Sequence, residues 1–280
     1  MLYWENGLIK NEENPHGFNF SNNYSGMAWE GVRSYNIGNN EHHVLFLKEH
    51  MDRLLKSALA LNLKSKYTSD QLCEATHNII SNFEDKNIYF RPCIFIDRLA
   101  EGVSKKENED YSVAIYPTPI SKLPKPKNGI NMCISSYRRG YPQFQMQIKN
   151  SSNYLVGQMA KEDATRQGFD DALFQDNNGY ITEAIVSNFF IIKNDIIYTP
   201  PNDGSILEGI TRNWIINKSG FNVKEKHLTR YDVYTADAAF ISGTFVELNH
   251  VTQIDHVTYY THELYEDLVN RYYRFICKLD

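Results

Sequence analysis

Pro200-Pro201 is followed by Gly209-Ile210-Thr211-Arg212 and then by a helical stretch over residues 213–217. This order predicts a helix that starts near Thr211, with Thr211 as its N-cap and Gly209 letting the backbone turn closely. The N-terminus of a helix offers unpaired N–H groups and a partial positive charge, for which a phosphate is a natural ligand. From this segment alone, an ordinary capped helix remains the alternative, because such caps are common.

The composition excludes several classes of protein. The chain has 280 residues and a formal charge of −5, which argues against a dedicated nucleic-acid binder. Apolar residues make up 42% of it, enough to fill real cores, yet no uninterrupted apolar run exceeds four residues, whereas a membrane span needs about 20. The opening MLYWENGLIK lacks the basic and apolar stretches of a signal peptide. We therefore expect a cytoplasmic protein that binds no nucleic acid and crosses no membrane.

Cysteine and histidine spacing indicates neither a disulfide framework nor a metal site. The four cysteines are far apart in the sequence, which favours reduced thiols. His250, His256 and His262 recur every six residues, a spacing that does not keep them on one helical face, and no zinc motif surrounds them. We expect no metal in this protein.

Turn signals and apolar spacing divide the chain into interleaved strands and helices. Asn6-Gly7 and Gly38-Asn39-Asn40 each separate two strand-like runs, which predicts antiparallel hairpins. From Leu47 onward the apolar positions take helical spacing, and Thr68 with Gln71 predicts a capping box at the start of a second helix. Because no steady βαβ alternation follows, the pattern favours an α+β fold.

A proline-rich stretch marks the predicted domain boundary. Residues 117–128, PTPISKLPKPKN, hold four of the nine prolines and predict an extended linker. It would join a smaller N-terminal domain, 1–116, to a larger C-terminal domain, 129–280. In the larger domain we expect a helix over 153–167, stopped by Gly168, and a final amphipathic helix over 261–277.

Ordered motifs along most of the chain resemble those of the class IV aminotransferases, which are pyridoxal-phosphate enzymes of fold type IV. In sequence order these motifs are Trp29-Glu30-Gly31-Val32-Arg33, Glu49-His50-Met51-Asp52-Arg53-Leu54, Tyr89-Phe90-Arg91-Pro92, Lys149-Asn150-Ser151-Ser152-Asn153-Tyr154, Tyr180-Ile181-Thr182-Glu183, Asn188-Phe189-Phe190, Thr199-Pro200-Pro201, Gly209-Ile210-Thr211-Arg212 and Ser242-Gly243-Thr244. The glycine-arginine strand, the Tyr-x-Arg-Pro segment and the lysine segment are most similar to those of branched-chain amino-acid aminotransferases. The resemblance implies a two-domain fold like that of D-amino-acid aminotransferase, with the cofactor on the larger domain.

The resemblance also implies which residues serve pyridoxal 5'-phosphate. It assigns Lys149 to the covalent bond with the cofactor aldehyde and to later proton transfer as the general base. It assigns Glu183 to the pyridine nitrogen, since a carboxylate within hydrogen-bonding distance favours the protonated ring. Tyr154 resembles the tyrosine that binds the cofactor's O3′.

The same resemblance assigns the phosphate group of the cofactor. The backbone N–H groups of Ile210 and Thr211, the hydroxyls of Thr211 and Thr244 and the guanidinium of Arg53 would bind it. For Arg53 an alternative follows from the sequence, because Glu49 lies four residues earlier and could form a surface ion pair with it.

The substrate pocket implied by the resemblance is largely aromatic. It would contain Tyr24 from a partner subunit, together with Trp29, Tyr89 and Arg91. Tyr89 and Arg91 are two residues apart in a predicted strand, so both would point to one face and could meet a carboxylate together. For Tyr24 and Trp29, plain core packing is the alternative.

Three residues depart from the branched-chain pattern. Phe245 follows Gly243-Thr244 where a small residue is usual, so it would bring a large ring to the substrate pocket. Ser152 stands where glycine usually precedes Asn-Tyr, and His250 replaces the proline expected before Val251. These departures concern substrate choice more than cofactor chemistry.

The resemblance implies a homodimeric enzyme that moves an amino group between a branched-chain L-amino acid and 2-oxoglutarate by a ping-pong mechanism. Other activities of the same fold stay open, namely a D-amino-acid or (R)-amine transaminase and an aminodeoxychorismate lyase. A binding protein that keeps the fold without turnover is a remote alternative, because it would not need Lys149, Glu183, Arg53 and Thr211 together.

Overall fold

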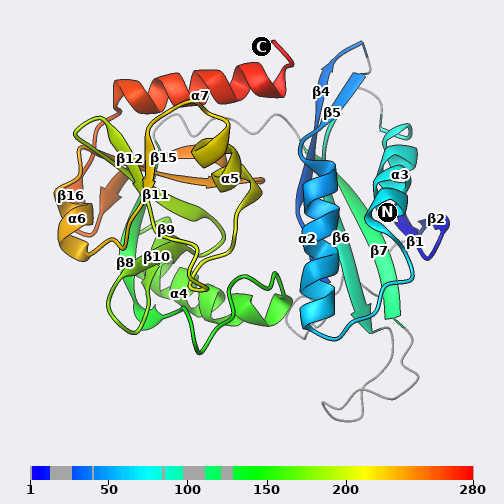
Figure 1. The fold of residues 1–280 in the computed structure, drawn as a ribbon, viewed down its shortest axis with the longest axis horizontal. Helices are drawn as coiled ribbons and strands as arrows, with labels where there is room; N and C mark the ends of the chain where they lie inside the picture. Colours follow the sequence, from blue (N-terminus) through cyan, green and yellow to red (C-terminus); the bar gives the residue numbers. More distant parts are fainter. Residues whose placement is uncertain are drawn as a thin grey trace. The chain divides into compact units, whose positions relative to one another are not determined.

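The computed structural model describes residues 2–12, 27–39, 41–83, 86–96, 111–120 and 129–279. The chain divides into two compact units (Figure 1). The N-terminal unit comprises Met1–Lys122 and Ile148–Asn153, and the C-terminal unit comprises Leu123–Gln147 and Tyr154–Asp280. Helices and strands are interleaved in both, as expected for an α+β protein. No helix in the described part of the chain is long and apolar enough to span a membrane.

In the residues that the structure describes, the N-terminal unit has a seven-stranded antiparallel sheet and two helices. Its strands follow the order β2-β1-β7-β6-β4-β5, and β3 pairs with β6. The elements are β1 (Leu2–Glu5), β2 (Leu8–Asn11), β3 (Ala28–Trp29), β4 (Val32–Gly38), β5 (Glu41–Val44), α2 (Leu47–Ala60), α3 (Ser69–Ile80), β6 (Asn87–Ile96) and β7 (Tyr111–Ile120).

Local signals position these elements as the sequence predicts. β1 and β2 form a hairpin around Asn6-Gly7, and β4 and β5 pair as antiparallel strands. Thr68 and Gln71 make the reciprocal hydrogen bonds of a capping box at the start of α3, which confirms that prediction.

Alternation along β6 gives this sheet two different faces. Ile88, Phe90 and Ile94 belong to the core shared with α2 and α3. Cys93 and Phe95 belong to a separate cluster, against which Trp29 packs. Tyr89 and Arg91 have the same parity as Cys93, so they lie on the face without the helices.

The predicted linker overlaps a strand. Residues 117–120 complete β7 and pair with β6, with Pro117 opposite Phe90 and Pro119 opposite Ile88. Prolines are tolerated here because β1 pairs only with Ala114 and Ile115 on the other side of β7, which leaves this end at the sheet edge. Residues 121–128 lie outside the described part of the chain. The short stretch Ile148–Asn153 belongs to the N-terminal unit, although the sequence suggested the C-terminal domain.

The C-terminal unit contains a ring of six strands. The pairs β10–β9, β9–β8, β8–β15, β15–β14, β14–β11 and β11–β10 close the ring, and β12, β13 and β16 extend it. The strands are β8 (Ile130–Arg138), β9 (Asp171–Gln175), β10 (Ile181–Ala184), β11 (Asn188–Lys193), β12 (Ile196–Thr199), β13 (Val223–Glu225), β14 (Ala238–Gly243), β15 (Glu247–Ile254) and β16 (Val257–Thr258). In the register of β10 with β11, Glu183 lies opposite Asn188.

Four helices accompany this sheet in the described residues: α4 (Leu155–Arg166), α5 (Ile210–Asn217), α6 (Arg230–Tyr234) and α7 (Glu263–Ile276). A short 3-10 helix, η2 (Ser151–Tyr154), precedes α4. The left-handed φ of Gly168, 85°, agrees with its predicted role in stopping α4.

Candidate active site

Lys149 is fixed at its backbone within the N-terminal unit. Its N–H donates to Ser57 Oγ at 3.1 Å, and its carbonyl accepts from the Trp29 N–H at 3.2 Å. Its Nζ lies 4.0 Å from the centroid of the Trp29 ring. The amine is therefore held against an aromatic face rather than extended freely into solvent.

Trp29 also contacts Arg91. The Arg91 Cζ lies 4.7 Å from the centroid of the same ring, so one indole contacts both Lys149 and Arg91. Nearby, a Cβ on Gly31 would lie 2.0 Å from the Tyr89 hydroxyl oxygen. The glycine therefore leaves the space that the Tyr89 ring occupies.

A buried ionic cluster surrounds Glu30. Arg53 donates from Nε and Nη2 to the two Glu30 oxygens at 2.6 and 2.8 Å, and His50 Nδ1 lies 2.8 Å from Oε2. Burial would raise the pKa of Glu30, but the Arg53 guanidinium and His50 hold it well below its usual range. Arg53 is only 14% exposed. It is therefore bound inside the unit, not on the exposed helix face that pairing with Glu49 would require.

Glu183 is buried in the C-terminal unit, where neutral and charged groups donate to it. Asn188 Nδ2 and the Leu207 N–H both donate to its Oε2 at 3.1 Å. Arg139 Nη2 is 3.4 Å from Oε1, but it makes a shorter bond of 2.6 Å to the Ala184 carbonyl, and Nη1 donates to Ile185 O at 3.1 Å. Burial lowers the pKa of Arg139, and Glu183 opposes that shift.

The N-terminus of α5 corrects the predicted cap. Gly209 is the N-cap, and Thr211 is the second residue of the helix, so the prediction of Thr211 as N-cap was wrong. Gly209 has φ −67° and ψ 132°, which other residues can adopt. The glycine is required for a different reason, because a Cβ there would lie 1.8 Å from Asn188 Oδ1. Ile210 and Thr211 consequently occupy the first turn, where backbone N–H groups have no partner within the helix.

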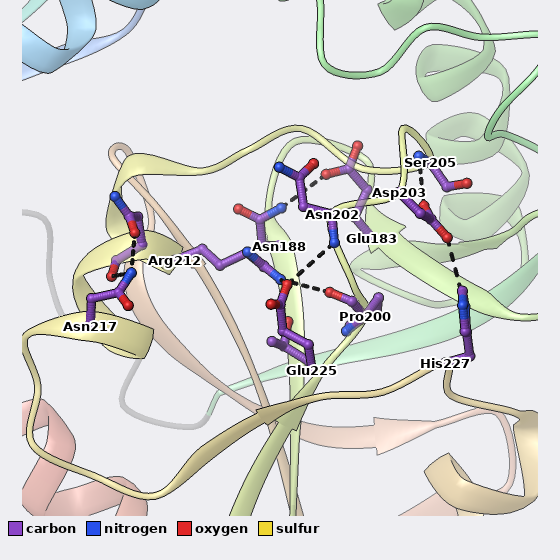
Figure 2. A network of polar contacts seen from close by, with 12 residues as sticks. Glu183, Asn188, Pro200, Asn202, Asp203, Ser205, Arg212, Asn217, Glu225 and His227 are labelled. Carbon is purple, nitrogen blue, oxygen red and sulfur yellow. Dashed lines mark hydrogen bonds and ion pairs between the residues drawn. The ribbon is translucent and has the colours of Figure 1, made fainter.

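Polar contacts fix the loop that leads into α5 (Figure 2). Arg212 donates to the Pro200 carbonyl at 2.8 Å and pairs with Glu225, which also accepts from the Asn202 N–H. At the other end, the Leu207 carbonyl accepts from Asn188 Nδ2 at 2.9 Å. The loop is thus held where it begins and where it meets Glu183.

The other predicted site residues that the structure describes lie in η2, in β15 or between β14 and β15. Tyr154 ends η2 and contributes to the electrostatics of Arg139. Thr244 lies between β14 and β15, and its neighbour Phe245 is 46% exposed. Ser152 is exposed on η2, whereas His250 is buried in β15, where burial lowers its pKa. Tyr24 lies outside the described residues.

Four buried residues of these clusters were not singled out by the sequence: Glu30, His50, Arg139 and Asn188. Three of them lie inside the motifs quoted above, so their position was visible but their partners were not. Arg139 directly follows β8, and nothing in the sequence distinguishes it from Arg138 beside it.

The donor set fits pyridoxal phosphate. The chain provides a lysine amine against an aromatic ring, a buried carboxylate for a protonated ring nitrogen, and a helix N-terminus for a phosphate. Asn188 donates to the carboxylate of Glu183, and its carboxamide oxygen lies against Gly209, the N-cap of α5 in the same unit.

Comparison with known proteins agrees with this donor set. The family described as amino-transferase class IV matches residues 28–254, and the chain belongs to that family. It is an aminotransferase, and its cofactor is pyridoxal phosphate.

Three of the matching proteins are named as branched-chain aminotransferases. A probable branched-chain-amino-acid aminotransferase of Rickettsia felis is 33% identical over 93% of this chain and 90% of its own length. The crystal structure of a branched-chain aminotransferase from Thermoproteus uzoniensis with norvaline has a TM-score of 0.91 and 30% identity, covering 99% of this chain and 95% of that one. The PLP form of the enzyme from Thermobaculum terrenum has a TM-score of 0.90 and 26% identity, covering 100% and 94%. These similarities confirm the predicted family and fold class.

Proposed function

We propose that this enzyme transfers the amino group of a branched-chain L-amino acid to 2-oxoglutarate in a ping-pong cycle. The relatives named above support the donor class, because they match along nearly the whole chain. The observation that carries the proposal is the shared contact of Lys149 and Arg91 with the Trp29 ring. It brings a proton-transferring amine close to a guanidinium that suits a carboxylate.

Each residue has a distinct part in the proposal. The bound cofactor supplies an electron sink for the substrate α-carbon. Lys149 Nζ binds the cofactor and then carries the proton to and from that carbon. Glu183 holds a proton at the ring nitrogen, and Tyr154 binds the cofactor's O3′.

The phosphate is assigned to the first turn of α5 and to cationic and hydroxyl side chains. The N–H groups of Ile210 and Thr211 and the hydroxyls of Thr211 and Thr244 donate to it. Arg53 adds charge, and Glu30 orients its guanidinium through the two short bonds described above.

The substrate is assigned to Trp29, Tyr89, Arg91 and Phe245, with Tyr24 from a second subunit. An aromatic wall suits an apolar side chain, and Tyr89 and Arg91 suit a carboxylate. We further propose that the enzyme is a homodimer, which Tyr24 of the second subunit requires, and that it is cytoplasmic.

The visible absorption spectrum of the purified enzyme tests this proposal. The band of the lysine-bound cofactor should disappear separately with L-leucine and with L-glutamate, and persist with D-alanine. Loss of the band only with D-alanine would assign the enzyme to the D-specific branch, and pyruvate release from aminodeoxychorismate would identify a lyase.

A matched pair of variants tests the part of Arg91. Arg91→Met should raise KM for the branched-chain amino acid and for 2-oxoglutarate by at least about tenfold, since a charge-assisted bond to a carboxylate is worth about 1.5–3 kcal/mol. Arg138→Met, at an exposed arginine, should leave KM unchanged. Equal KM values in the two variants would contradict the assignment.

A further inference from the structure

We infer that Asn188 is a positioning residue that couples the Glu183 carboxylate to the N-terminus of α5, so that the two ends of the cofactor are bound as one unit. The inference rests on the proposed roles of Glu183 and α5. Asn188 itself has no part in the proposed function, so the inference gives it a new role.

Asn188 touches both groups with one carboxamide. Its Nδ2 donates to Glu183 Oε2 at 3.1 Å and to the Leu207 carbonyl at 2.9 Å. The Leu207 N–H returns a bond to the same Glu183 oxygen at 3.1 Å. Leu207, two residues before the α5 N-cap, is therefore tied to the Glu183 carboxylate through its N–H and to Asn188 through its carbonyl.

The oxygen of the same carboxamide lies against Gly209. A Cβ at that position would be 1.8 Å from Oδ1 and 3.0 Å from Cγ of Asn188, far closer than any real contact. Gly209 is the N-cap of α5, so Asn188 lies against the residue that precedes the N–H groups assigned to the phosphate.

Asn188 is itself held rigidly. It begins β11, lies opposite Glu183 in the pairing of β10 with β11, and lies opposite Ser242 in the pairing of β11 with β14. The side chain is buried. Because strands on both sides fix its backbone, Asn188 cannot move away as a whole when its carboxamide is displaced at Gly209. The displacement should therefore change the hydrogen bond between the carboxamide and Glu183.

Two measurements report on the two ends separately. The affinity of the cofactor-free protein for inorganic phosphate reports on α5. The 15N chemical shift of bound pyridoxal phosphate, labelled at the ring nitrogen, reports on Glu183 in the loaded enzyme. Neither measurement depends on turnover.

Gly209→Ala places its new methyl group at the phosphate end of the coupled pair, against the Asn188 carboxamide. We expect its phosphate affinity to fall about tenfold, within the usual range for coupled sites. We also expect the 15N shift to move toward that of the unprotonated ring, because the displaced carboxamide no longer supports Glu183. Asn188→Ala should produce both changes, and adding Gly209→Ala to it should produce no further loss, because the clash is gone.

Control variants keep the test decisive. Asn217→Ala, at an exposed asparagine on the far end of α5, should change neither measurement. Asn188→Ser gives a smaller deletion that should show the same pattern if Asn188→Ala fails to fold. A Gly209→Ala enzyme that loses phosphate affinity but keeps the wild-type 15N shift would overturn the inference. So would additive losses in the double variant.

Failure of the inference differs from failure of the proposed function. If the wild-type protein forms no visible cofactor band, the proposed function fails. If the wild-type band and activity are present and only the transmitted 15N change is missing, Asn188 is not the coupling residue and the proposed function stands.

Discussion

The two units each bury a glutamate beside an arginine, but they bind it differently. In the N-terminal unit, Arg53 holds Glu30 with two short charge-assisted bonds, and His50 adds a third contact. In the C-terminal unit, Arg139 is 3.4 Å from Glu183 and directs its shorter bonds to backbone carbonyls. Asn188 Nδ2 and the Leu207 N–H, both neutral groups, donate to Glu183 at 3.1 Å.

This difference separates a structural carboxylate from one suited to a ligand. A carboxylate matched by a bidentate guanidinium has its charge neutralised by the protein, so Glu30 serves to hold Arg53. Glu183 has a longer contact with its arginine and also accepts from neutral groups, an arrangement that suits a protonated pyridine nitrogen as a further partner. Residue type alone would not distinguish the two.

Removing the charge of Glu183 should have the largest effect. We expect Glu183→Gln to lower kcat/KM by about 10²–10³-fold, similar to the loss of one transition-state hydrogen bond elsewhere, because the amide cannot hold the ring nitrogen protonated. Steady-state kinetics with L-leucine measure it. Glu266→Gln, on the exposed side of α7, is the control. Equal activity in the two variants would show that the charge of Glu183 is not needed for catalysis, and Glu183 would then be a structural carboxylate like Glu30.

Removing the charge of Glu30 should act chiefly on stability. Glu30→Gln leaves Arg53 without its ionic partner, and breaking a buried pair costs about 3–5 kcal/mol of unfolding free energy. Denaturant unfolding measures this loss. Glu49→Gln removes the partner that sequence spacing suggested and should stay within about 0.5 kcal/mol of wild type. A larger loss of stability in Glu49→Gln than in Glu30→Gln would show that Arg53 pairs with Glu49 instead of Glu30.

Arg139 should matter more for its carbonyl partners than for Glu183. Arg139→Met leaves the carbonyls of Ala184 and Ile185 without their donor, which should cost about 2 kcal/mol of unfolding free energy. Its effect on kcat/KM should be smaller than that of Glu183→Gln. Arg138→Met, next to it in sequence but exposed, should show neither effect. A larger kinetic loss than Glu183→Gln would make Arg139 a direct participant.

His50 should give the smallest effect, seen only as a pH dependence. Burial lowers the pKa of His50, although Glu30 opposes the shift. Below the ordinary histidine pKa of about 6.5, the unfolded chain therefore gains a proton that folded His50 resists, and stability falls as the pH falls. Glu30 stays ionised in this window, because its pKa is held well below it.

Unfolding measured at pH 7.5 and 5.5 tests this expectation. His50→Gln should lose less stability between the two pH values than the wild type. His77→Gln, at an exposed position on α3, should keep the wild-type dependence. If the stability of His50→Gln changed with pH as much as that of the wild type, groups other than His50 would cause the pH dependence.

Much of the fold could be predicted from the sequence because neighbouring residues determine it. Hairpin turns at Asn6-Gly7, the Thr68 capping box and the end of α4 at Gly168 each depend on residues within a few positions of one another. The end of β7 was missed for the opposite reason. Its prolines are allowed by where β1 stops pairing, which is a property of the assembled sheet.

The candidate site was predictable in its residues but not in their partners. Motif order identified Lys149, Glu183 and Arg53, whereas the pairing of Arg53 with Glu30 joins residues 23 positions apart. The glycine before Ile210 was predicted for its backbone freedom. Its actual reason is the carboxamide of Asn188, which no spacing rule in the sequence places there.

The pairing of Glu183 with Asn188 also bears on the order in which the ring of strands can form. These two residues are five positions apart, so their strands meet with little loss of chain entropy. The parallel pairing of β8 with β15 joins Ile130 to Val251, across most of the unit. During synthesis, the hairpin that carries Glu183 can form while the chain is still growing. The ring itself must wait until the residues of β15 have emerged.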